Sequence, residues 1–473
     1  MKVVHISPEC YPVAKAGGLG DVVGSLPKYL TKSGIDTKVV MPFFNSEYAQ
    51  DHSWQVDYKH SFIFGSLNGE AVIYKEVSGD LGFDLYVVEI PFLFPRNEVY
   101  GYFDDSDRYI AFQIVVLNWL TQWKDVPDIV HCHDHTTGLI PFLMKYGFDY
   151  WKLREIPSVF TIHNGEYQGQ YGWDKESLLP IYNHWYRGML DWDGDVNPMA
   201  SAIKCSSAFT TVSEGYLQEL IGSPDSIGRL VEWESEKAFG IINGIDESEW
   251  NPDSDIKLTH NYSPSSFEEG KSLVKQGICQ EYGLDPNLPL ISYIGRFAFE
   301  KGADVLPGAI EKILMEGHKV NFIIVGSGRH DISDRVVELK AKYDSNVGVY
   351  VGYNEVLARN LYAGSDFLLM PSRVEPCGLN QMYAMRYGTI PIVRLVGGLK
   401  DTVEDVGDGG EGFTFVNLNE EDVLHAVKRA LRMYSDKEAM NNKIRDLMEK
   451  DFSWESSTLK YIALYKSLTG TLI

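Results

Sequence analysis

The sequence predicts an α/β protein made of two doubly wound domains that face a cleft. The chain has 473 residues, which is more than one hydrophobic core usually serves. Short apolar runs rich in β-branched residues recur along it, and most are continuous, as in strands buried on both faces of a parallel sheet. Helical patterns fill many of the gaps, and such alternation favours parallel sheets with right-handed crossovers.

The predicted strands form two series. The first series comprises residues 2–7, 37–42, 84–90, 128–133, 158–163 and 209–213. The second comprises residues 290–296, 321–328, 347–353, 366–372 and 390–395. Residues 251–271 lie between them, are polar and contain two prolines, so we expect them to connect the domains. The N-terminal domain is then expected over 1–250 and the C-terminal domain over 272–452, with ligands at the carboxyl ends of the strands.

Two helices are predicted most clearly. Near the start of the chain, one helical face collects Leu19, Val22, Val23, Leu26 and Leu30. At its end, residues 453–468 form an amphipathic pattern whose apolar side collects Trp454, Tyr461, Ile462, Tyr465 and Leu468.

Charge and cysteine usage narrow the class of protein. There are 43 basic and 66 acidic residues, a net charge of −23, which disfavours nucleic acid or an anionic membrane as a partner. The five cysteines lie far apart without a CxxC pair, as is typical of reduced thiols. The first residues show no secretory leader, and no apolar stretch approaches a membrane span of about 18 residues. We therefore expect a cytoplasmic protein.

The stretch "KAGGLGDVVGSLPKYL" (15–30) predicts a phosphate site. Its glycines are spaced G-x-G-x-x-x-G, one residue longer than a dinucleotide fingerprint. A glycine-lined helix N-terminus nevertheless favours a phosphate through its free amides and its dipole. Lys15 could add positive charge and Asp21 could accept sugar hydroxyls, whereas the alternative is a plain glycine turn with a solvated lysine.

Two motifs of the second series carry charged residues. "GRFAFEKG" (295–302) places Arg296 and Lys301 after a strand, where two cations can hold a diphosphate leaving group. The alternative is that these two side chains are ordinary surface charges in contact with solvent. Glu375 comes directly before a Pro-Cys-Gly turn that should open a helix. A carboxylate beside a helix N-terminus suits recognition of a polar ligand.

The histidine-rich "HCHDH" (131–135) raises a metal hypothesis. Strand alternation would place His131, His133 and His135 on one face, and imidazole is a common metal ligand. The spacing does not fit the binuclear hydrolase pattern H-x-H-x-D-H, which needs one more residue before its aspartate. Histidines satisfied by hydrogen bonds at a strand end are the alternative, and "TIHNG" (161–165) adds His163 after another strand.

Together these motifs resemble a known enzyme family. The opening glycine stretch, "HCHDHTTGLIP", "TIHNG", "NGID" (243–246), "GRFAFEKG" and "EPCGLNQMYAMRYGTIPIVRLVGGLKDTV" are similar to bacterial glycogen synthases and plant starch synthases. The resemblance implies two Rossmann-like domains of the GT-B type and a C-terminal helix within 453–473 that crosses back to the N-terminal domain. It also implies retaining transfer of glucose, usually from ADP-glucose, to the non-reducing 4-OH of an α-1,4-glucan, with no metal.

The resemblance also implies roles for individual residues. Arg296 and Lys301 match the pair that binds the distal phosphate, Glu375 the acidic residue by the transferred glucose, and Tyr353 the ring that stacks on the base. His163 matches a histidine near the sugar, and Asp134 an aspartate near the acceptor. The remaining matches are donor and sugar contacts: Lys15, Gly17, Gly18, Asp21, Asn243, Cys377, Gly378 and Leu379.

The chain departs from the family pattern at three places. The family usually has His-Asp-Trp-His where this chain has His133-Asp134-His135-Thr136, Asp-Asn where it has Asp104-Asp105, and Gly-Leu-Thr-Gln where it has Gly378-Leu379-Asn380-Gln381. Three other functions stay open at this point. They are a related retaining transferase that uses UDP-glucose or another acceptor, a metal-dependent hydrolase built on "HCHDH", and a catalytically silent glucan-binding scaffold.

Overall fold

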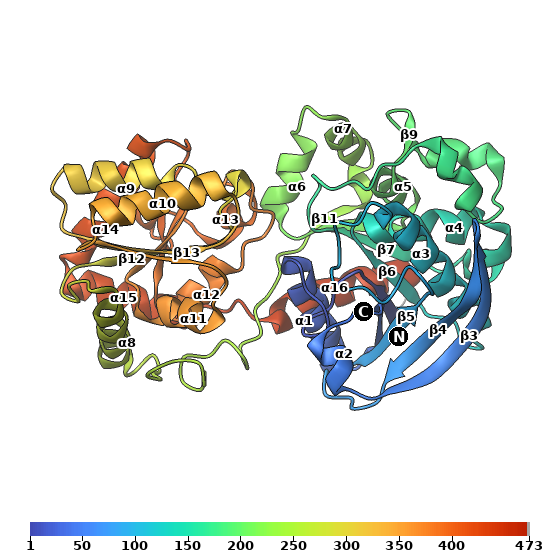
Figure 1. Ribbon diagram of the computed structural model, residues 1–473, viewed down its shortest axis with the longest axis horizontal. Helices are drawn as coiled ribbons and strands as arrows, with labels where there is room; N and C mark the ends of the chain where they lie inside the picture. The colour runs from blue at the N-terminus through green and yellow to red at the C-terminus, as the bar shows by residue number, and fades with distance from the viewer. Residues whose placement is uncertain (471–473) are drawn as a thin grey trace. The chain divides into compact units, whose positions relative to one another are not determined.

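The computed structural model describes residues 1–470. They form two compact units, one of Met1–Asn243 with the C-terminal segment from Trp454, the other of Gly244–Ser453. Each unit has its own largely parallel sheet with helices packed on it (Figure 1), which confirms the predicted α/β class with two doubly wound domains. Residues 471–473, the last of the predicted segment 453–473, lie outside the described part. Within residues 1–470, no helix combines the length and the apolar character needed to cross a membrane.

The first unit is built on a nine-stranded sheet in the order β11-β10-β7-β6-β1-β2-β5-β4-β3. The strands of this sheet are β1 (Lys2–Ile6), β2 (Asp36–Pro42), β3 (Trp54–Phe64), β4 (Leu67–Glu76), β5 (Asp84–Glu89), β6 (Ile129–His133), β7 (Ser158–Ile162), β10 (Ala208–Thr211) and β11 (Ala238–Gly240). From β11 to β5 all neighbours pair in parallel. All six predicted strands of the first series are present, because their continuous apolar runs are buried on both faces.

The long hairpin of β3 and β4 at one edge of this sheet was not predicted (Figure 1). Both strands pair antiparallel, and exposed residues recur along both of them, so one face meets solvent. A search for continuous apolar runs misses such strands because half of their residues are polar.

The helices of the first unit pack around its sheet. They are α1 (Gly18–Lys32), α2 (Glu47–Asp51), α3 (Asp105–Gln122), α4 (Ile140–Tyr146), α5 (Pro198–Cys205), α6 (Glu214–Ile221), α7 (Ser226–Trp233) and α16 (Trp454–Thr469), with a small ribbon of β8 (Asp191–Trp192) and β9 (Asp195–Val196). The apolar face predicted for the first helix is buried in α1. From the other end of the chain, Trp454, Tyr461 and Tyr465 of α16 join the same core cluster as Val22 and Leu26. The last helix therefore completes the core of the first unit.

The second unit contains a six-stranded, entirely parallel sheet in the order β14-β13-β12-β15-β16-β17. Its strands are β12 (Leu290–Ile294), β13 (Asn321–Gly326), β14 (Val347–Val351), β15 (Phe367–Met370), β16 (Ile390–Arg394) and β17 (Phe413–Phe415). Its helices are α8 (Phe267–Tyr282), α9 (Leu306–Met315), α10 (His330–Lys342), α11 (Glu355–Gly364), α12 (Asn380–Arg386), α13 (Gly397–Thr402), α14 (Glu420–Tyr434) and α15 (Lys437–Met448). Helices α9 and α10 lie over one face of the sheet and α8 and α11 over the other (Figure 1).

The chain divides between Asn243 and Gly244, ahead of the segment 251–271 that was expected to connect the domains. That segment is part of the second unit because its polar side chains are tied down there. Asp255 bonds Arg359 at 3.1 Å and Tyr387 at 2.6 Å. The hydroxyl of Tyr262 donates to the carbonyl of Tyr387 at 2.7 Å. Composition alone suggested a linker, whereas long-range hydrogen bonds make it structured.

Arg359 holds this region together, and its removal is expected to destabilise the second unit. Its side chain is 1% exposed and reaches Glu249 at 2.6 Å, Glu355 at 2.8 Å and Asp255 at 3.1 Å. Arg359→Ala leaves the buried Asp255 carboxylate without its cation, so we expect a loss of about 3–5 kcal/mol in the free energy of unfolding. Urea unfolding measures it. Arg329→Ala, which breaks the exposed pair with Asp331, is the matched control and should leave the midpoint nearly unchanged. Equal midpoints for the two variants would contradict this account.

Candidate active site

In each unit, several predicted site residues follow the two strands at which the chain order of the sheet reverses, Lys15 and Asp134 in the first unit and Lys301 and Glu375 in the second. In the first unit β1 to β5 all lie on one side of the sheet, from β1 to its β3 edge, and the chain then returns to place β6 on the other side of β1. In the second unit it builds β12, β13 and β14 and returns to place β15 beside β12. Open α/β sheets bind ligands at such switch points, outside the carboxyl ends of the strands.

At the switch point of the second unit, Lys301 meets Glu375. Lys301 ends a short turn after β12, and Glu375 lies in the loop after β15. The Lys301 ammonium donates to both carboxylate oxygens of Glu375, each at 2.8 Å, and the hydroxyl of Ser372 donates to one of them at 3.0 Å. Glu375 is 7% exposed, and these hydrogen bonds offset the cost of burying its carboxylate. The structure thus brings together two predicted residues that lie 74 positions apart.

Arg296 and Tyr353 lie on two loops at the same edge of this sheet, after β12 and β14, with β13 between these strands. Arg296 follows β12, and its guanidinium pairs with Glu300 at 2.7 Å while 61% of the side chain stays exposed. Tyr353 follows β14 and is 82% exposed. An exposed aromatic ring has a free face, as stacking on a base requires, and an exposed guanidinium can reach an anion. Both side chains are available to a ligand.

The turn of Cys377, Gly378 and Leu379 is fixed by a second glycine turn that packs against it. Gly378 has φ +74°, and a Cβ there would meet the Gln381 side chain at 2.5 Å. The amide of Gly398 donates to the carbonyl of Glu375 at 3.0 Å. At Gly397, where φ is +44°, a Cβ would meet that same carbonyl oxygen at 2.1 Å. These contacts fix the backbone of Glu375 and explain the glycines at both turns.

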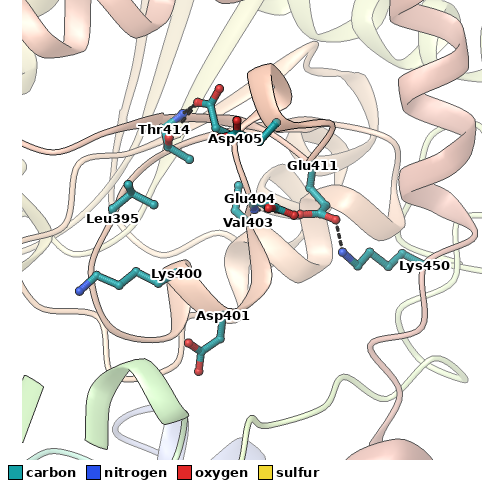
Figure 2. Close-up of a pocket in the computed structure, with 10 residues that line it drawn as sticks. Leu395, Lys400, Asp401, Val403, Glu404, Asp405, Glu411, Thr414 and Lys450 are labelled. Carbon is teal, nitrogen blue, oxygen red and sulfur yellow. Dashed lines mark hydrogen bonds and ion pairs between the residues drawn. The ribbon is translucent and has the colours of Figure 1, made fainter. Parts of the chain in front are cut away.

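A cavity of about 430 Å³ lies elsewhere in the second unit, and none of the predicted site residues lines it (Figure 2). It holds two lysines against five carboxylates, which belong to Asp401, Glu404, Asp405, Asp408 and Glu411. Figure 2 shows Asp405 bonded to Thr414 and Glu411 facing Lys450, so some of these groups serve structural contacts. The net negative charge argues against a phosphate ligand in this cavity.

At the switch point of the first unit, the glycine-rich loop is held by a residue that the sequence analysis did not single out. The carboxylate of Glu9, which is 3% exposed, accepts from the amides of Ala16 at 2.6 Å and Gly17 at 2.9 Å. Lys15 pairs with Asp21 at 2.7 Å. The Gly17 amide that was predicted for a phosphate is therefore engaged by Glu9. The sequence feature that could have indicated this role is the position of Glu9, a carboxylate shortly after β1 and close to the glycine-rich loop.

Asp134 follows β6 in a strained backbone conformation and holds His163, which follows β7. Its φ of +57° and ψ of +174° are rare for a residue other than glycine and often mark functional positions. One carboxylate oxygen accepts the backbone N–H of His163 at 2.7 Å. Desolvation raises the pKa of Asp134 to about 7, although hydrogen bonds from the amides of His163 and Asn164 oppose this. Near neutral pH this carboxyl group is poised between its two charge states.

The raised pKa of Asp134 predicts a pH-dependent stability. Its folded pKa of about 7 lies above its ordinary value of 3.8, so the folded chain binds the extra proton between these values. The stability from this group is present at low pH and is lost as the pH rises through 7. Asp134→Asn keeps the acceptor for His163 but carries no charge, so we expect it to be more stable than the parent at pH 8. Because Asp134 is partly exposed, we expect the free energy of unfolding of the variant to exceed that of the parent by about 2 kcal/mol at pH 8, and this difference should shrink toward pH 4. Urea unfolding at both pH values checks this, and a pH-independent difference would contradict it.

The structure corrects the prediction that His131, His133 and His135 share one face. His131 and His133 stack with ring centroids 4.3 Å apart, but the positive φ of Asp134 turns His135 away into a short helical turn. The histidine that joins His131 and His133 is instead His5 of β1, which pairs in register with His131. Among residues 1–470, this trio of buried histidines is the group whose ligand atoms lie close enough for a metal, within 4.8 Å of one another. Both ring nitrogens of His131 already bond hydroxyls, those of Tyr465 at 2.7 Å and Thr161 at 2.6 Å.

Asn243, the last residue of the first unit before its C-terminal helix, is 5% exposed and has a buried side-chain oxygen that accepts no hydrogen bond from the described residues. Such an atom costs stability unless a ligand or water bonds it.

Comparisons with known proteins cover nearly the whole length of the chain. The starch synthase catalytic domain family matches residues 2–230, and the family of glycosyl transferases group 1 matches residues 275–447. A glycogen synthase of Flavobacterium johnsoniae is 46% identical over 466 residues, 98% of each chain. A glycogen synthase of Alkaliphilus metalliredigens is 36% identical over 99% of this chain and 100% of its own.

Solved structures show the same similarity. The catalytic domain of starch synthase IV from Arabidopsis thaliana, bound to ADP and acarbose, superimposes with a TM-score of 0.90 at 32% identity, covering 99% of each chain. Sucrose-phosphate synthase from Thermosynechococcus elongatus shares the fold, with a TM-score of 0.62 at 16% identity over 100% of both chains.

Proposed function

The chain belongs to the glycogen synthase and starch synthase family of glycosyltransferases, and we propose that it transfers glucose from ADP-glucose to the non-reducing 4-OH of an α-1,4-glucan with retention of configuration. The observation that best supports this reaction is the pairing of Lys301 with Glu375 at the switch point of the second sheet. ADP in the starch synthase structure supports the choice of adenine nucleotide.

The second unit would hold the donor. An ammonium group has three N–H donors, and two of those of Lys301 reach Glu375, so one remains for a phosphate oxygen. Arg296 would bind the same distal phosphate, and Tyr353 would stack on the base. Glu375 would accept hydroxyls of the transferred glucose at the turn of Cys377, Gly378 and Leu379.

We propose front-face transfer as the mechanism. Both oxygens of Glu375 accept from Lys301, and one oxygen of Asp134 accepts from the amide of His163, so both carboxylates already serve contacts within the protein and the proposed mechanism uses neither as a nucleophile. The bond between the anomeric carbon and the phosphate oxygen breaks while the acceptor hydroxyl attacks from the same face. The departing phosphate oxygen takes the proton of that hydroxyl. Lys301, Arg296 and the Gly18 amide would stabilise the developing charge on the diphosphate, and such electrostatic stabilisation usually contributes most to the rate in sites of this kind.

The first unit would contribute polar contacts to the substrates. Lys15 and the Gly18 amide would act on the donor phosphates, with Asp21 as a hydroxyl acceptor, while Gly17 would hold the loop through Glu9. Asp134 would face the acceptor glucan and His163 the sugar. The unsatisfied oxygen of Asn243 would accept a sugar hydroxyl, which would remove the cost of leaving it unbonded.

We propose that no metal takes part. The cations that would balance the diphosphate are side chains, Arg296 and Lys301, and the His131 nitrogens in the histidine trio are engaged by hydroxyls. A cytoplasmic location belongs to the same proposal and is supported by five free cysteines, all of them buried.

Radiolabelled ADP-glucose with glycogen primer, UDP-glucose in parallel and EDTA throughout, tests the proposal. We expect label in the glucan, release of ADP, and weaker incorporation from UDP-glucose. Preference for UDP-glucose would favour the related transferase, and loss of activity in EDTA would favour a metal enzyme. Glucan binding without release of nucleoside diphosphate would favour the silent scaffold.

A further inference from the structure

Three buried imidazoles form a hydrogen-bonded row that ends at His163, the histidine proposed above to face the sugar. Nδ1 of His5 lies 3.0 Å from Nε2 of His133, and Nδ1 of His133 lies 3.0 Å from Nε2 of His163. His5 and His133 have no exposed surface, whereas His163 is 8% exposed. The row therefore runs from the core of the first unit, across β1 and β6, to the end of β7.

Each ring in the row is neutral near pH 7. Burial lowers the pKa of His5 and of His163 to about 3 and that of His133 well below its ordinary value. A neutral imidazole donates from one nitrogen and accepts at the other. The two hydrogen bonds of the row must therefore point the same way, so only two arrangements of protons exist.

The buried end of the row selects between these arrangements. Nε2 of His5 is buried without a partner among the described residues. If the bonds point toward His5, this nitrogen carries an N–H with no acceptor. If they point toward His163, it carries only a lone pair, which is the better tolerated of the two because buried orphan N–H groups are rare. In that second arrangement all three rings carry their proton on Nδ1.

We propose that His133, with His5 behind it, is a positioning residue that holds His163 as the tautomer protonated on Nδ1, so that His163 donates a hydrogen bond to the sugar. Within the described part of the chain, Nδ1 of His163 has no hydrogen-bonding partner, and it is the end of the row nearest solvent. The Asp134 carboxylate fixes the backbone of the same residue. The identity of the ligand as a sugar rests on the proposed function, whereas the assignment of the His163 tautomer does not depend on it.

Nitrogen NMR of protein labelled with 15N-histidine tests this assignment, with the His163 signals identified by their loss in His163→Gln. We expect Nδ1 of His163 to carry the proton in the parent. His133→Leu should mix the tautomers and lower kcat about tenfold, the effect of one hydrogen bond, with KM for ADP-glucose within about twofold. His133→Asn returns a donor near the position of Nδ1 and should restore both the tautomer and most of kcat. His131→Leu is the matched control, since it is equally buried on the same strand but does not touch His163.

Several results would overturn the inference. They are a parent His163 protonated on Nε2, a His133→Leu variant with unchanged tautomer and kcat, a His133→Asn variant as impaired as His133→Leu, and a His131→Leu variant that shifts the His163 signals equally. If His133→Leu does not fold, the parent spectrum and His133→Asn still decide. Because the spectra are recorded without substrate, a parent that transfers no glucose would reject the proposed function and leave the tautomer result standing.

Discussion

Lys301→Ala is expected to lower kcat by about 10² to 10³, the cost of removing one charged group that stabilises a developing anion. The substitution acts in two ways. It removes the cation proposed for the leaving diphosphate, and it leaves the Glu375 carboxylate without that cation, while the hydroxyl of Ser372 still donates to it. A carboxylate without its cation beside the diphosphate adds repulsion to the lost attraction. Steady-state kinetics with ADP-glucose and glycogen measures the effect.

Two further variants make this result specific. Lys301→Arg keeps the charge and should retain more activity than Lys301→Ala, though not all of it, because guanidinium geometry differs from that of ammonium. Lys342→Ala removes a lysine of the same unit that forms an exposed pair with Glu311, so it should not change kcat. A Lys301→Ala variant that turns over within a few-fold of the parent would show that Lys301 does not stabilise the leaving diphosphate.

Gly397→Ala is expected to lower kcat about 10²-fold with little loss of folded protein. The added methyl would lie 2.1 Å from the carbonyl oxygen of Glu375, and φ at this position is +44°, so the backbone that carries Glu375 must move. Misplacing a catalytic group by about 1 Å can cost this much. Activity and circular dichroism of the purified variant, recorded together, separate misplacement from unfolding.

Gly277→Ala is the control for Gly397→Ala. Gly277 lies within α8, and nothing stands within 4 Å of the Cβ that alanine would add. Alanine favours the helix there by up to about 1 kcal/mol, so the control should keep full activity and unfold at a slightly higher temperature. A fully active Gly397→Ala would show that the glycine turn does not position Glu375.

The sequence allowed much of the fold to be predicted because buried parallel strands leave a local signal. "LISYIGR" became β12, and the apolar face of residues 19–30 became the buried side of α1. The position of Lys301 and Glu375 at one sheet edge also follows from this pattern, since each comes after a strand. Their roles toward a ligand stay predictions.

What could not be predicted depends on contacts between distant parts of the chain. His5 joins the trio with His131 and His133 because β1 pairs with β6 in a register that sets His5 beside His131. Nor does the sequence show that the carboxylate of Glu9 accepts from the amides of Ala16 and Gly17. Likewise, the polar composition of 251–271 does not reveal that Asp255 binds Arg359.

A crystal structure of the protein with bound ADP tests most directly whether the chemistry is centred on the diphosphate. We expect distal phosphate oxygens within hydrogen-bonding distance of Lys301 and Arg296, next to the carboxyl ends of β12 and β15, with the adenine against Tyr353. A diphosphate bound elsewhere, with Lys301 still on Glu375 and no phosphate contact to either cation, would contradict this expectation.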